Sequence, residues 1–180
     1  MNLHPIFVHF PVALLTVYAL MELLRFRKLQ GQPYWFYVKA LFLMIGGLGA
    51  LAALATGDAA RLAARMGEFH PAVANFSQVV RLHESFADLS VAIFGLLAAS
   101  YLILWLDREN FGRWLGSAGL QSFWAVLRKM AGLLADSPLS VILALAGLAS
   151  ITITGGLGGI MVYGPGVDPI FGLFYRLLFP

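Results

Sequence analysis

The chain has 180 residues, of which 60% are hydrophobic and 12% are charged, and its mean hydropathy is +0.82. Soluble domains carry about 25% charged residues, so this composition excludes an ordinary soluble domain and predicts an integral membrane protein. The absence of cysteine excludes disulfides, thiolate-held iron–sulfur clusters and cysteine-ligated zinc, and a formal charge of +3 is too small and too scattered to favour nucleic-acid binding.

The first eleven residues, MNLHPIFVHFP, place His4 and His9 at the head of a long apolar run. A membrane-spanning helix needs about 20 mostly apolar residues, and residues 6–24 form the first such segment. Pro11 falls in its first turns, where a missing backbone N–H costs least. No lysine or arginine precedes the run and no small-residue cleavage site follows promptly, so we expect the helix to stay in the mature protein as an anchor.

Three further apolar segments follow, separated by polar connections. Thr56-Gly57-Asp58 is expected to close the second span, and a short amphipathic helix is expected over residues 59–66. A later connection alternates apolar with basic residues, which is typical of a helix lying in the membrane interface. The sequence therefore predicts one all-α transmembrane domain over residues 1–180, a four-helix bundle with spans 6–24, 35–55, 86–106 and 139–163 and an interfacial helix over 113–135.

The distribution of basic residues predicts the orientation, because lysine and arginine are enriched in cytoplasmic loops. The connections after the first and third spans carry eight of the twelve basic residues: Arg25, Arg27, Lys28, Lys39, Arg108, Arg113, Arg128 and Lys129. We therefore expect a multi-pass protein of the bacterial inner membrane with both termini in the periplasm. All four histidines, His4, His9, His70 and His83, then fall at the outer face.

Histidines at membrane depth are typical axial ligands of haem b. We expect His9 and His83 to hold a haem near the outer face, with His4 and His70 as ligands of a second haem or as gating residues. Since His4 and His9 are separated by roughly 140° around a helix, they are expected to serve different sites. Gly46 and Gly49 in the second span are candidates for close approach of the cofactor.

Simpler interpretations stay open for the same residues. A histidine near a membrane interface is often only a polar anchor or a helix cap. Three or four imidazoles could instead bind zinc or copper. Glycine clusters in membrane helices, including Gly155 and Gly159, commonly serve helix packing rather than cofactor contact.

Two motifs resemble those of an uncharacterised family of bacterial four-span predicted membrane proteins. The first is HPxxVHFP, formed here by residues 4–11, and the second is GGxxVYxxGV, which corresponds to residues 158–167. Thr56-Gly57-Asp58 and His83 also match the family pattern. The segments 61–80 and 110–136 are expanded relative to it. The resemblance implies a redox role, because domains of this type occur beside Rieske-type or cytochrome c modules.

These observations lead to three hypotheses of function. The first is a b-type cytochrome-like electron-transfer subunit with one or two haems, which links quinone or quinol to a periplasmic redox partner and so belongs to an oxidoreductase complex. The second is a non-catalytic anchor or assembly subunit of a larger membrane complex. The third is a membrane protein that binds a metal through its histidines. None of the three involves nucleic acid.

Overall fold

The computed structural model describes residues 4–65, 73 and 75–179, and for residues 4–6 and 58–65 it describes the backbone alone. All regular structure in these ranges is helical. The elements are α1 (His4–Leu23), α2 (Arg27–Gln30), α3 (Pro33–Arg65), α4 (Phe76–Arg108), the 3-10 helix η1 (Phe111–Trp114), α5 (Ala118–Ala135), α6 (Pro138–Tyr163) and α7 (Pro169–Leu178).

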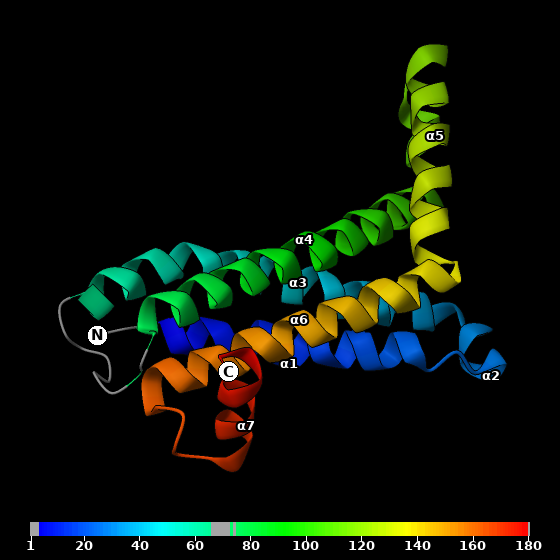
Figure 1. Cartoon of the computed structure of the whole chain (residues 1–180). Coiled ribbons are helices and arrows are strands. Elements are labelled where there is room, and N and C mark those ends of the chain that lie inside the picture. The colour runs from blue at the N-terminus through cyan, green and yellow to red at the C-terminus, as the bar shows by residue number, and fades with distance from the viewer. Residues whose placement is uncertain (1–3, 66–72, 74, 180) are drawn as a thin grey trace.

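Four helices, α1, α3, α4 and α6, lie side by side and alternate in direction, as Figure 1 shows. The starts of α1 and α4 lie at one end of the bundle, which we call the histidine end because His9 and His83 belong to it. The α1–α3 connection, the end of α4 and all of α5 lie at the opposite end, which we call the basic end. Both α1 and α4 pack against α3 and α6, so α1 and α4 occupy opposite corners.

Within the described residues, three helical segments are long and apolar enough to cross a membrane: Pro33–Gly57, Phe76–Arg108 and Pro138–Tyr163. The apolar part of α1, Phe7–Leu23, is shorter. Many of their apolar side chains face outward, including Leu48, which is 68% exposed. Apolar side chains on the outside of a helical bundle are expected where lipid is the solvent. The architecture is therefore that of a helical membrane bundle.

Two helices extend further than the predicted spans. The expected break at Thr56-Gly57-Asp58 is wrong, because α3 continues through these residues to Arg65. The hydroxyl of Thr56 donates to the carbonyl of Ala52 at 3.1 Å, a bond that lets threonine remain inside a helix. Residues 59–65 of the separate amphipathic helix predicted over 59–66 therefore form the last part of α3, and residue 66 lies outside the described residues. Similarly, α4 starts at Phe76, well before the predicted span.

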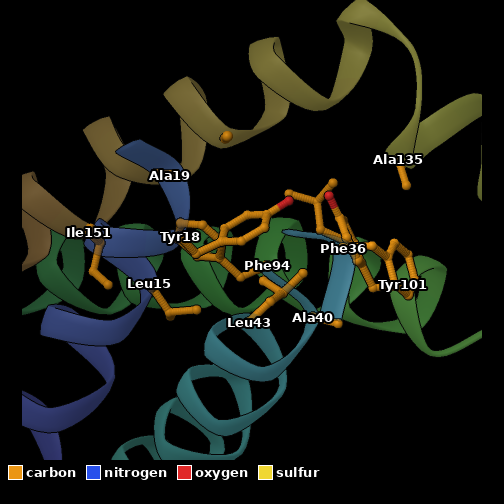
Figure 2. Packing of buried hydrophobic residues seen from close by; sticks show 12 residues of the cluster. Leu15, Tyr18, Ala19, Phe36, Ala40, Leu43, Phe94, Tyr101, Ala135 and Ile151 are labelled. Atoms are coloured by element: carbon orange, nitrogen blue, oxygen red, sulfur yellow. The ribbon is translucent and has the colours of Figure 1, made fainter. Parts of the chain in front are cut away.

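Aromatic rings fill the centre of the bundle, where α1 and α4 meet across the diagonal. Tyr18 is fully buried and packs edge-on against Phe94 and Tyr101, with ring centroids 6.3 and 5.9 Å apart. Phe36 of α3 stacks on Tyr101 at 5.2 Å. Figure 2 shows the hydroxyl of Tyr18 directed toward the side where Phe36 and Tyr101 lie. Such pairs add roughly 0.5–1.5 kcal/mol each beyond the area they bury.

The helix α5 projects from the basic end of the bundle at a steep angle to the bundle axis (Figure 1). Ser117 caps it by accepting from the N–H of Leu120, and Trp124 Nε1 donates to Asp107 of α4 at 3.1 Å. One face is exposed and apolar, formed by Leu120, Phe123, Val126, Met130 and Leu133. The segment predicted as a helix over 113–135 thus contains the end of η1, a short link and α5.

Candidate functional sites at the two ends of the bundle

His83 is the histidine whose surroundings the structure defines best. It lies half-buried on α4, and its Nδ1 is 2.9 Å from the carbonyl oxygen of Thr154 on α6. Because a carbonyl only accepts, Nδ1 carries the proton, and the lone pair of the neutral ring is on Nε2. The ring also lies beside Gly158, where an added Cβ would come within 3.4 Å of Cε1. Helix α6 therefore orients this imidazole through contacts at the Nδ1–Cε1 edge of the ring.

The structure describes the surroundings of the other three predicted ligands in less detail. His9 is exposed on α1, two residues before the buried Pro11. His4 starts α1, but its side chain lies outside the described residues, and so does all of His70. Within the described part of the chain, no group of three or more histidine, aspartate or glutamate residues is arranged to hold a metal ion. The predicted pairing of His9 with His83 stays a prediction.

Gly46 and Gly49 lie on the face of α3 that α1 covers. A Cβ on Gly46 would come within 2.8 Å of the Leu15 side chain, and one on Gly49 within 3.3 Å of Pro11. These two glycines therefore permit close packing of α1 on α3. Helix packing is a common role of glycine in membrane helices. The later glycines serve α7 in the same way, because Gly156 faces Phe174 and Gly159 faces Phe171.

The basic end holds a second candidate site, centred on the buried carboxylate of Glu22, which is 1% exposed. Its Oε2 accepts from Lys39 Nζ at 2.9 Å and from the Tyr101 hydroxyl at 3.1 Å. Its Oε1 accepts from Arg25 Nη2 at 3.1 Å and from the Ser140 hydroxyl at 2.6 Å. The four partners come from α3, α4, the residues after α1, and α6. One carboxylate thus connects all four helices of the bundle.

From the sequence, Glu22 is an acidic residue near the end of the first apolar run, and such a residue is expected to reach the interface. The structure buries its carboxylate instead. The signal for a buried site was present all the same, because ionisable residues inside spanning helices are rare and usually face the bundle interior with a partner. Lys39 sits inside the second predicted span and supplies that partner.

A cleft of about 300 Å³ opens beside this carboxylate. Its lining includes three cationic side chains, Arg25, Lys39 and Arg108, against two acidic ones, Glu22 and the exposed Asp136. The guanidinium of Arg108 lies 3.6 Å from the ring centroid of Phe36. A guanidinium over an aromatic face is stabilised by the ring without using its N–H donors in a salt bridge. The cleft therefore presents a net positive charge.

Fold, composition and surface define the chain as a multi-helix membrane protein. The chain belongs to the family described as predicted membrane protein (DUF2231), whose family model matches residues 1–169. This agrees with the family that its first and last motifs resemble. No curated protein and no solved structure matches the chain.

Proposed function

We propose that the protein is a b-type cytochrome-like subunit that binds haem at the histidine end and transfers electrons between quinone and a periplasmic redox partner. The observation that carries the proposal is the hydrogen bond from His83 Nδ1 to the Thr154 carbonyl. Histidines that ligate metals almost always donate their other ring N–H to a carbonyl, carboxylate or water, which fixes the ring and raises its basicity. Nε2 of His83 would then be an axial ligand. A bound haem supplies one-electron chemistry.

The second axial ligand is proposed from α1, which lies diagonally opposite α4 in the bundle. The buried stripe of α1 contains Pro11, Leu15, Tyr18 and Glu22. Position 4 precedes Glu22 by about five helical turns and so shares this register, whereas position 9 is roughly 200° from Pro11. This spacing favours His4 over His9 as the partner of His83, although His9 was the first choice from sequence alone.

The proposal adds α1 to the three longer apolar helices, which gives four spans. It also places the protein in the bacterial inner membrane with both termini in the periplasm. The eight basic residues at the basic end of the bundle support that orientation. The direction of α5 supports an interfacial position for it, because a helix that projects at a steep angle from one end of the bundle lies along the membrane surface when the bundle spans the bilayer.

Visible absorption of the protein purified from haem-replete cells tests the proposal. We expect a Soret band that shifts on reduction, is lost in His83→Ala and His4→Ala, and persists in His9→Ala. Circular dichroism of each variant verifies that the helices remain folded. A wild-type protein without a Soret band, or a folded His83→Ala variant with an unchanged spectrum, contradicts haem binding. Elemental analysis for zinc and copper then distinguishes the metal-binding alternative.

One observation favours the second hypothesis, that of an anchor or assembly subunit. The apolar face of α5 is exposed. Apolar side chains of α7, including Ile170 and Leu177, are exposed as well, because no other part of the described chain covers them. A partner subunit would bury such a surface. Size-exclusion chromatography of the purified chain tests this hypothesis, and a monodisperse protein without co-purifying subunits counts against it.

A further inference from the structure

We infer that the cleft at the basic end binds a phosphate group, and that an anionic phospholipid headgroup is its source in the membrane. This site is separate from the histidine end and does not depend on haem. Its first support is the arrangement of Arg25, Lys39 and Arg108 around one cleft. Basic pockets between membrane helices are suited to lipid phosphates, since guanidinium and ammonium groups form charge-assisted hydrogen bonds with them.

The acidic residues of the cleft do not balance the charge of its cationic side chains or engage all of their N–H donors. Glu22 accepts from Arg25 and Lys39, and Asp136 also lines the cleft, so three positive charges face two negative ones. Arg108 makes no ion pair with any described residue and is held against Phe36 instead. The buried Nε of Arg25 has no hydrogen-bond partner in the part of the chain that the structure describes. Donor capacity and positive charge therefore remain for an anion.

The position and size of the cleft favour a lipid. It lies at the end of the bundle between the α1–α3 connection, the end of α4 and the α5–α6 turn. Its walls include the partly exposed Trp35, and tryptophan gathers at the depth of lipid headgroups. A volume of about 300 Å³ is at the lower end of ligand pockets and suits a headgroup, with the acyl chains left outside against the apolar helices.

Thermal unfolding in detergent tests the inference on the full chain. We expect added phosphatidylglycerol to raise the unfolding midpoint and phosphatidylcholine to leave it nearly unchanged. Arg108→Gln should raise the phosphatidylglycerol concentration needed for the same rise of the midpoint about tenfold, which corresponds to the loss of one charged hydrogen bond. Arg27→Gln is the matched control, because Arg27 is exposed on α2 at the same end and does not line the cleft. Equal responses to the two lipids, or equal losses in both variants, overturn the inference of a lipid site.

Two further measurements complete the test. Sodium phosphate and glycerol phosphate, each compared with chloride at equal ionic strength, distinguish a soluble phosphate from a lipid headgroup. If these salts raise the unfolding midpoint as phosphatidylglycerol does, and Arg108→Gln weakens that rise, a soluble phosphate is the ligand of the same cleft. If Arg108→Gln does not fold, native mass spectrometry of the unmodified protein takes its place. Preferential retention of phosphatidylglycerol over phosphatidylcholine supports the site, and no preference together with no response to soluble phosphate overturns it.

Discussion

The hydroxyl of Ser140 on α6 donates a hydrogen bond of 2.6 Å to Oε1 of Glu22 on α1, and the two residues are 118 positions apart in the chain. Ser140 is fully buried, and Arg25 also donates to its oxygen. This bond joins the first and last helices of the bundle at the basic end, while Lys39 and Tyr101 join the other two to the same carboxylate. The buried charge therefore organises the end of the bundle opposite the histidines.

Replacing Glu22 by glutamine should destabilise the protein strongly. The substitution removes the negative charge and leaves Arg25 and Lys39 without compensation, and breaking a buried ion pair on one side costs about 3–5 kcal/mol. The unfolding midpoint in detergent is the measurement, with Glu109→Gln as the control because Glu109 is exposed at the same end. Similar midpoints for the two variants would show that the Glu22 network does not hold the helices together.

The two central tyrosines should respond differently to loss of their hydroxyls. Tyr101→Phe removes a donor to Glu22 and should cost about 1–2 kcal/mol. The hydroxyl of Tyr18 is buried beside that of Tyr101 and makes no hydrogen bond of standard geometry within the described residues, so Tyr18→Phe should cost less than Tyr101→Phe. Thermal unfolding of the two variants side by side measures the difference, and a larger loss for Tyr18→Phe would contradict the observed hydrogen bonding.

The contact between Gly147 and Phe94 should not tolerate an added methyl group. A Cβ at position 147 would lie 2.7 Å from Cζ of the fully buried Phe94, so Gly147→Ala should cost roughly 1–3 kcal/mol through overpacking. Gly95→Ala is the control, because nothing lies within 4 Å of its added Cβ and alanine favours the helix. Equal unfolding midpoints for both variants would mean that α4 and α6 do not pack closely at Gly147 and Phe94.

Single cysteines can establish the orientation, because the chain contains none and thiol labelling has no background. Val167 is exposed at the histidine end, and Ser122 is exposed on α5 at the basic end. A membrane-impermeant thiol reagent should label Val167→Cys in cells with a permeabilised outer membrane, and Ser122→Cys only after the inner membrane is disrupted. The reverse pattern would place the histidine end in the cytoplasm and remove the periplasmic partner from the proposed function.

The class of fold and most of its helices follow from the sequence, because apolar runs of spanning length depend on local composition alone. The order of helices and the alternation of their direction follow from the same runs, because successive spanning helices run in opposite directions. The ends of helices were harder to predict. Thr56, Gly57 and Asp58 look like a stop signal, yet α3 continues, since the threonine hydroxyl bonds within the helix and does not compete with it.

The candidate sites divide in a similar way. The sequence by itself singled out the histidines, because imidazole is rare in membrane helices, and it placed them toward one side from the basic residues of the connections. Only the tertiary structure decided that His83 bonds to Thr154, that Gly46 and Gly49 receive α1, and that Glu22 meets Lys39, Tyr101 and Ser140. The physical reason is that composition and periodicity report which residues prefer lipid or an interface, whereas the partner of a buried polar group depends on how distant helices are rotated against one another.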